Sequence, residues 1–452
     1  MLPLSVNHAK YAVIPPMPLT QRSTAVELDT SSAYQRTTLK NGIRVITSHM
    51  THTKAVSVVF LVGAGSRYET DDEAGVSHLF EHMLFKGTPS RPRPRDISGV
   101  VESVGGTINA FTDRECTGYW CRMALPHYRR GVEVLADIIK SPLFRESDIE
   151  QEKHVVLEEI RATHDSPGAL AGMLLDSALW PDQALGRDIA GTIESVEAIP
   201  REVMIDYHRE QYVGCNIVVC VAGNVDHDEV VEQVDELLSD LPCGEPRGMF
   251  PYDDNLVGPS VIGGSRDLEQ LHMALAFQGV GMNDSRRTAL RIMTVVLGGS
   301  MSSRLFEEVR EKRGLAYGIG SSMHSLTDCG VVDIHTGVEP PRAVEALSVI
   351  VDELAKIRDG ITEEELSDAR ELAKGRLILG MEESRAVAND LAAQELLRGS
   401  VETLDDRIKS LEAVTLDDVR AIASEVVTLE KLAMSAVGPV KDWSKFERAL
   451  NF

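Results

Sequence analysis

The sequence predicts an α+β fold of two homologous domains, each a mainly antiparallel sheet with helices on one face. At 452 residues the chain is longer than a single hydrophobic core usually serves. It also repeats itself, because residues 196–225 are echoed by residues 411–440. A second echo pairs residues 128–156 with 341–372, and each of these reads as a helix, a turn and the acidic start of another helix. Two copies of one α+β unit are therefore expected.

Prolines and glycines mark the limits of these domains. Pro15, Pro16 and Pro18 exclude a regular helix or a central strand near the N-terminus, which predicts an extended arm there. Between the two copies, a run rich in proline, glycine and aspartate shows neither helical nor alternating periodicity and is the expected linker. The expected parts are the arm at 1–34, a first domain at 35–245, the linker at 246–260 and a second domain at 261–452.

The first domain opens with the pattern of a β-hairpin. Asn41 and Gly42 form a turn dipeptide between two strand-like runs. The apolar run 55–65 that follows is typical of a buried strand. Within each copy the strands connect through hairpins as often as through helices, which favours mainly antiparallel sheets.

Composition and charge exclude several classes of protein. The hydrophobic fraction is 43%, and no run of about 18 apolar residues could cross a bilayer. The formal net charge of −24 would repel nucleic acid and anionic lipid, so neither is an expected partner. Because the N-terminus lacks a basic head followed by an apolar core, we expect a cytoplasmic protein. The cysteines form no CxxC pair and are expected to be buried free thiols: Cys116, Cys121, Cys215, Cys220, Cys243 and Cys329.

A histidine pair on an apolar helix predicts a metal site. His78 and His82 are four residues apart in the segment 74–87, which places both imidazoles on one helical face. Glu81 lies beside them and suits a general base that is not itself a ligand. A chance HxxEH pattern on an amphipathic helix is the alternative, and two histidines leave a catalytic zinc one protein ligand short of its usual three.

The acidic helix predicted at 145–165 is the best source of the missing ligand. Glu152 and Glu159 are seven residues apart and share a face, whereas Glu158 points about 100° away from Glu159. We therefore predict Glu159 as the ligand, with Glu152 as its neighbour on the same face. The alternative is that these are solvated helix acids, which is also our expectation for Glu158 and His154.

Four segments carry a resemblance to a known family. They are HLFEHMLFKGT (78–88), GGTINAFTDRE (105–115), VVLEEI (155–160) and LGGSMSSRLFEEVREKRGLAYGIGS (297–321). With them the chain resembles the pitrilysin and mitochondrial-processing-peptidase family from about residue 35 onward, and HxxEH is the inverted form of the familiar zinc peptidase motif. The resemblance implies a zinc endopeptidase with one Zn²⁺ per chain in the first domain. Its ligand spacing points to Glu159, with Glu158 as the competing assignment, and assigns Glu152 a supporting role.

The same resemblance implies how a substrate is held. Asn109, Ala110 and Phe111 match an edge strand to which an extended peptide adds as a further strand. Arg310 and Tyr317 match residues that hold the substrate backbone or the oxyanion. The second domain lacks HxxEH and is expected to bind no zinc.

Relatives of this length pair two chains into a hollow chamber, so the resemblance implies a peptide-cleaving homodimer in which Arg310 and Tyr317 approach the partner's zinc. Basic or presequence-like peptides fit the negative charge of this chain. Three alternatives stay open: a non-catalytic subunit of a larger complex, the catalytic subunit of an obligate heterodimer, and a zinc-binding regulator without hydrolysis.

Overall fold

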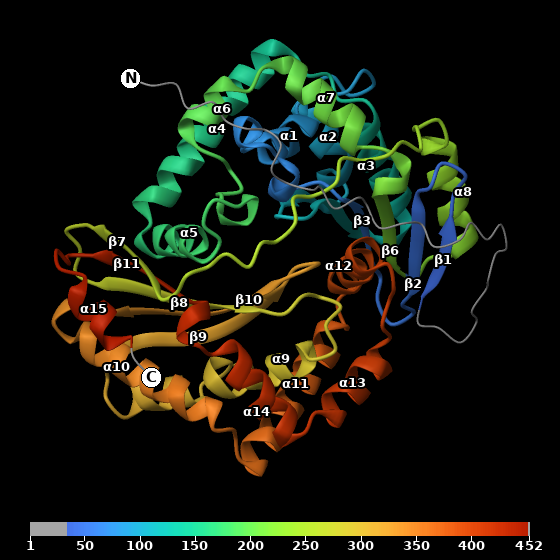
Figure 1. The fold of residues 1–452 in the computed structure, drawn as a ribbon. Coiled ribbons are helices and arrows are strands. Elements are labelled where there is room, and N and C mark those ends of the chain that lie inside the picture. The colour runs from blue at the N-terminus through green and yellow to red at the C-terminus, as the bar shows by residue number, and fades with distance from the viewer. Residues whose placement is uncertain (1–33, 451–452) are drawn as a thin grey trace. The chain divides into compact units, whose positions relative to one another are not determined.

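The computed structural model describes residues 34–450, which form two compact units (Figure 1). The predicted N-terminal arm lies outside the described residues except for its last position. Within the described part of the chain, no helix is long and apolar enough to cross a membrane. Among the described residues, the first unit combines 34–157, 189–253 and 384–401, and the second combines 158–188, 254–383 and 402–450.

The sheet of the first unit has six strands in the order β1-β2-β6-β3-β5-β4. Every neighbouring pair is antiparallel except β2 and β6, which are parallel. The predicted hairpin joins β1 to β2, and Gly42 in its turn has a φ of 90°, a conformation that favours glycine. The strands are β1 (Gln35–Thr38), β2 (Arg44–His49), β3 (Ala55–Val62), β4 (Thr107–Thr112), β5 (Thr117–Ala124) and β6 (Ile217–Gly223).

The sheet of the second unit repeats this topology. Its strand order, β7-β11-β8-β10-β9, matches β2-β6-β3-β5-β4 strand for strand, and its one parallel pair, β7 with β11, is the counterpart of β2 with β6. The strands are β7 (Ser260–Ser265), β8 (Leu271–Gly279), β9 (Ala316–Ser325), β10 (Gly330–Val338) and β11 (Leu432–Gly438).

The repeated segments of the sequence therefore form corresponding helices and strands in the two units. Helix α7 (Arg201–Gln211) and strand β6 lie in the first echoed segment, and α14 (Leu416–Val426) and β11 lie in its partner. The second echo pairs α3 (Tyr128–Lys140) with α10 (Ala343–Arg358). The predicted fold class, two α+β copies with mainly antiparallel sheets, is confirmed.

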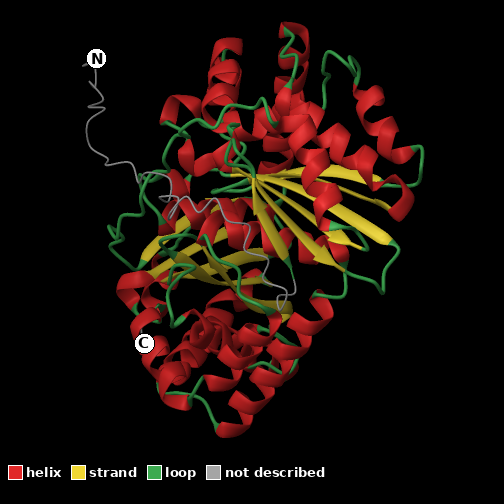
Figure 2. Cartoon of the chain, turned by 90° about the vertical axis from the view of Figure 1, so that its right-hand side faces the viewer, coloured by secondary structure: helices red, strands yellow, loops and turns green. Residues whose placement is uncertain are grey.

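Helices pack against both sheets (Figure 2). The remaining helices of the first unit are α1 (Val76–Leu84), α2 (Pro94–Glu102), α6 (Ile193–Ala198), α8 (His227–Leu238) and α12 (Ser384–Ala393). Those of the second unit are α5 (Pro167–Leu179), α9 (Arg287–Gly298), α11 (Glu363–Gly380), α13 (Leu404–Ala413) and α15 (Ser444–Ala449). Helix α4 (Glu146–Asp165) is continuous across the division between the units, which falls within it.

Each sheet also carries one helix on the face opposite its main helical layer, and that helix comes from the other half of the sequence. In the first unit α3 packs at Cys121 of β5, whereas the Ser57 hydroxyl of β3 points to the other face and lies 2.9 Å from the Ser384 hydroxyl of α12. In the second unit the Ser435 hydroxyl of β11 donates to the Ala171 carbonyl of α5 at 2.5 Å. The central strands are thus covered on both faces, which explains why β6 and β11 are buried along their whole length.

The cysteines are free thiols, and four of the six are buried. The expectation that all six are buried is wrong for two: Cys243 is exposed and Cys215 is half-buried. Cys243 lies in the irregular segment that follows α8, and the Cys215 thiol donates to its carbonyl at 2.9 Å. An irregular segment leaves such side chains partly open to solvent.

Candidate metal centre and active site

The helix that carries the HxxEH motif, α1, has a firmly held N-terminus. Gly75 precedes it with a φ of 92°, and a Cβ there would lie 2.5 Å from the Ala190 carbonyl oxygen. The buried Glu69 carboxylate accepts hydrogen bonds from the backbone N–H groups of Gly75 (2.9 Å) and Ser77 (2.8 Å). The Tyr207 hydroxyl donates to the Ser77 hydroxyl at 2.9 Å. A carboxylate at this end satisfies helical N–H groups and complements the helix dipole, which fixes where α1 begins.

The two faces of α1 have different surroundings. Leu79, Phe80 and Met83 are buried, and the Phe80 ring packs on Tyr212 with centroids 4.5 Å apart. The rings of His78 and His82 lie side by side on another face, with centroids 4.8 Å apart. A spacing of four residues on a well-packed helix therefore presents both imidazoles together.

Glu159 of α4 completes a group of three side chains that could hold a metal ion. One ligand atom each from His78, His82 and Glu159 lies within 4.8 Å of the others, and no further group of this kind occurs between residues 34 and 450. Donor atoms around a tetrahedral zinc lie roughly 3–4 Å apart, since each is about 2 Å from the ion. Two imidazole nitrogens and one carboxylate oxygen are a donor set of catalytic zinc sites, so these residues fit the ion.

The competing acid on the same helix faces elsewhere. Glu158 is exposed and forms an ion pair with Arg161, one turn along α4. His154 is also exposed. Glu159 is exposed as well, so the two acids differ in the direction of their side chains, by about 100° of helical rotation, and not in burial.

Burial sets the protonation state of His78. Desolvation, followed by the neighbouring His82, lowers the pKa of the His78 imidazole to about 4. The ring is therefore neutral at neutral pH, and a neutral imidazole is the form that binds metal.

Glu152 orients the second histidine. Its carboxylate accepts a hydrogen bond from His82 Nδ1 at 3.1 Å and an ion-paired hydrogen bond from Lys86. Burial raises the pKa of Glu152, but the bonds from His82 and Lys86 outweigh burial and hold that pKa below its usual value. Since an ionised carboxylate only accepts, Nδ1 of His82 must carry the proton, and Nε2 is the ring nitrogen that can face a metal.

The candidate base, Glu81, contacts the edge strand of the sheet. The Thr112 hydroxyl, at the end of β4, donates to Glu81 Oε2 at 2.7 Å. In the described sheet β4 has β5 as its one neighbour, so its other edge is open to hydrogen bonding. Asn109 and Phe111 lie on this strand with exposed side chains, and the Asn109 side chain accepts from the Ala110 N–H at 2.8 Å.

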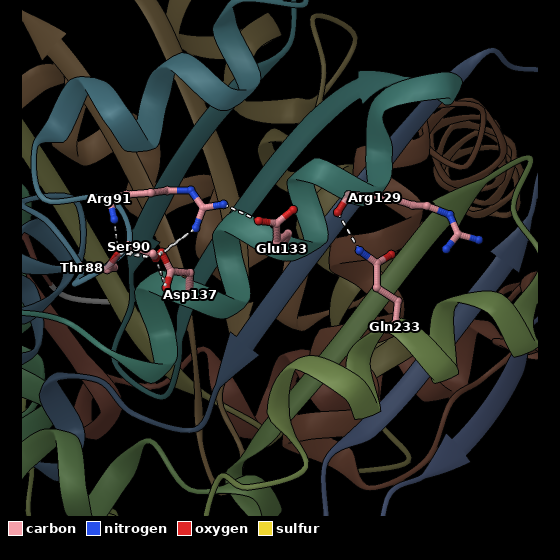
Figure 3. A network of polar contacts seen from close by, with 7 residues as sticks. All are labelled: Thr88, Ser90, Arg91, Arg129, Glu133, Asp137 and Gln233. Carbon is pink, nitrogen blue, oxygen red and sulfur yellow. Dashed lines mark hydrogen bonds and ion pairs between the residues drawn. The ribbon is translucent and has the colours of Figure 1, made fainter.

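The loop after α1 is tied to α3 by a polar network that the sequence did not suggest (Figure 3). The Arg91 guanidinium donates to Asp137 at 2.6 Å and to Glu133 at 2.5 Å. The Thr88 and Ser90 hydroxyls donate to the same aspartate at 2.6 and 2.7 Å. Because Lys86 lies in the same loop, two residues before Thr88, the network also limits how far the C-terminal end of α1 can move.

Arg310 and Tyr317 lie together in the second unit. Arg310 belongs to a π-helical turn, Phe306–Glu311, and Tyr317 to the start of β9. The guanidinium carbon of Arg310 is 5.0 Å from the Tyr317 ring centroid, within the range of a cation–π contact. The Tyr317 side chain is 85% exposed, so its ring and hydroxyl are accessible from solvent.

Sequence comparisons place the chain in a family. Residues 44–193 match the family described as insulinase, peptidase family M16, and residues 198–372 match the inactive domain of peptidase M16. An uncharacterized zinc protease from Streptomyces coelicolor is 35% identical over 90% of this chain and 90% of its own length. One from Mycobacterium leprae is 35% identical over 93% of this chain and 95% of its own length.

Solved structures share the fold. A protease from Helicobacter pylori superposes with a TM-score of 0.85 at 24% identity, covering 90% of this chain and 99% of its own. A chain of complex III from Candida albicans does so with a TM-score of 0.79 at 20% identity, covering 92% and 100%. The resemblance inferred from the sequence motifs is thus confirmed, and the chain belongs to the M16 family of peptidases.

Proposed function

We propose that this protein is a zinc-dependent endopeptidase whose single zinc is held by His78, His82 and Glu159. The observation that carries the proposal is the convergence of these three side chains, with Glu81 on the same helix as the two histidines. Relatives that are about one third identical over nearly the whole chain are named zinc proteases, which supports the same chemistry here.

Glu81 performs the proton transfers. Bound zinc supplies a Lewis acid that polarises the peptide carbonyl and lowers the pKa of a water molecule. The Glu81 carboxylate accepts the proton of the attacking water and then delivers it to the leaving amine. Glu81 lies on the packed helix α1, and its carboxylate accepts a hydrogen bond from the Thr112 hydroxyl at 2.7 Å.

The open edge of β4 is the proposed binding site of the peptide. An extended segment can add to this edge through main-chain hydrogen bonds, which select for extended backbone more than for sequence. Asn109, Ala110 and Phe111 would lie along it. Unfolded or presequence-like peptides are the substrates that such a site accepts, and the net charge of −24 favours basic ones.

The proposal is tested by cleavage of a library of unstructured peptides, with cut sites mapped by mass spectrometry. We expect cuts by the zinc-loaded chain, none after removal of the metal with a chelator, and recovery when zinc is added back. Zinc binding without any cleavage would instead identify a zinc-binding regulator. A need for a second, different chain would identify the catalytic half of a heterodimer.

A non-catalytic role is the remaining alternative, because a complex III chain from Candida albicans has the same fold. That likeness concerns the fold alone. The metal-binding group, the adjacent base and the Arg310–Tyr317 pair are all present in this chain, which supports catalysis.

We also propose a homodimer in which Arg310 and Tyr317 of one chain act at the zinc of the other. Mixing a Glu81→Gln chain with a Tyr317→Phe chain tests this arrangement. Each variant alone is expected to be nearly inactive, whereas random exchange of subunits should restore about a quarter of the wild-type sites. The measurement is peptide cleavage after mixing and re-equilibration. Activity no higher than the sum of the two separate variants would show that Tyr317 does not act across a dimer.

A further inference from the structure

The general base of the proposed mechanism is held by a residue outside the HxxEH helix. Thr112 Oγ1 lies 2.7 Å from Glu81 Oε2, with the hydroxyl as the donor. Thr112 is the last residue of β4, the strand whose other edge is open for a peptide. Its side chain is half-buried and therefore partly shielded from competing water.

The end of β4 at Thr112 is rigidly supported. The N–H of the following residue, Asp113, donates to the Cys116 carbonyl at 2.8 Å and closes the turn into β5. Arg67 N donates to the Arg114 carbonyl at 2.8 Å. The fully buried Arg67 guanidinium is paired with Glu115 at 2.6 Å. Breaking a buried ion pair is strongly destabilising, so this turn resists displacement and gives Thr112 a fixed position.

A glutamate requires such support to serve as a base. Its side chain rotates about several bonds, whereas proton transfer requires an oxygen within about 2.6–3.2 Å of the water. Threonine is well suited to fix it, because a β-branched side chain has few rotamers and its hydroxyl can donate to a carboxylate. The bond to Oε2 therefore fixes the direction in which the Glu81 carboxylate points.

We infer that Thr112 is a positioning residue for Glu81, and this inference rests on the function proposed above. One strand would then carry both the backbone edge that pairs with the peptide and the hydroxyl that aims the base. The position of the substrate carbonyl and the position of the base are consequently set by the same element. Such shared support is how a site keeps reacting groups within a few tenths of an ångström of each other.

Thr112→Val tests the inference, because valine keeps the branched shape and removes the hydroxyl. We expect kcat to fall by about 10- to 100-fold with KM changed less than about twofold, since misplacing a reacting group by about 1 Å can cost as much as 100-fold. Zinc content and the thermal unfolding midpoint should match the wild type. Thr112→Ser, which keeps the hydroxyl, should retain kcat to within about threefold.

Thr38→Val is the matched control. Thr38 is the last residue of β1, the strand at the opposite edge of the same sheet, and its side chain is exposed. It should have wild-type kcat and KM. In a Glu81→Gln background, Thr112→Val should cause no further loss, because residues that act through one another are not additive.

Wild-type kcat in Thr112→Val would overturn this inference and leave the proposed function standing. A loss of kcat in Thr112→Ser as large as that in Thr112→Val would do the same. A change confined to KM would place Thr112 in peptide binding instead. A zinc-loaded wild-type chain that cleaves nothing would overturn the proposed function and this inference with it.

Discussion

Glu81→Gln is expected to lower kcat by about 100- to 10,000-fold, the contribution of a well-placed general base. Glutamine has nearly the same shape, and its amide oxygen can still accept the hydrogen bond from Thr112. It cannot take a proton from water. Zinc content, measured by elemental analysis, and the thermal unfolding midpoint should therefore stay at wild-type values while peptide cleavage is lost.

Glu102→Gln is the control for this substitution. Glu102 is exposed at the end of α2, so the same chemical change there should leave kcat unaltered. A Glu81→Gln protein with wild-type kcat would remove Glu81 from the mechanism. Loss of zinc together with activity would instead mean that Glu81 helps to hold the ion.

Glu159→Gln is expected to weaken zinc binding by more than about 100-fold and to abolish cleavage at ordinary zinc concentrations. The reason is that it replaces the only charged ligand, whereas changes to residues that merely orient ligands already cost about 10- to 100-fold in affinity. The measurement is competition for zinc against a chromophoric chelator at pH 7. Added zinc should partly restore binding, because an amide oxygen is a weaker ligand.

The neighbouring Glu158→Gln is a closely matched control. It removes the same charge one residue away, and its ion pair with Arg161 lies on the exposed face of α4. Surface pairs of this kind contribute about 0–1 kcal/mol, so zinc affinity and activity should be unchanged. If Glu158→Gln weakened zinc binding and Glu159→Gln did not, the assignment of the ligand would be reversed.

Features that depend on local periodicity could be predicted from the sequence. The repeat is visible because α7 with β6, and α14 with β11, have the same lengths and the same spacing, and each strand ends in glycine. The convergence of His78 and His82 follows from helical spacing alone. The choice of Glu159 over Glu158 follows from the rotation of about 100° per residue in a helix.

Features that depend on contacts between distant segments could not be predicted from the sequence. Thr112 reaches Glu81 from a strand, and Glu69 closes the N-terminus of α1 from the preceding loop. Neither contact leaves a recognisable sequence pattern, since an isolated threonine or glutamate is also what an ordinary exposed position would contain. The exchange of α5 and α12 between the halves of the chain is equally invisible, because an apolar helix face does not reveal which sheet it covers.

The position of the bound zinc tests the account most directly. Crystals of the zinc-loaded chain, measured at wavelengths on either side of the zinc absorption edge, would locate the ion by its anomalous scattering. We expect one strong peak per chain, about 2 Å from a ring nitrogen of His78, from Nε2 of His82 and from a carboxylate oxygen of Glu159. A peak elsewhere, or a peak at the two histidines with Glu159 turned away, would contradict the account.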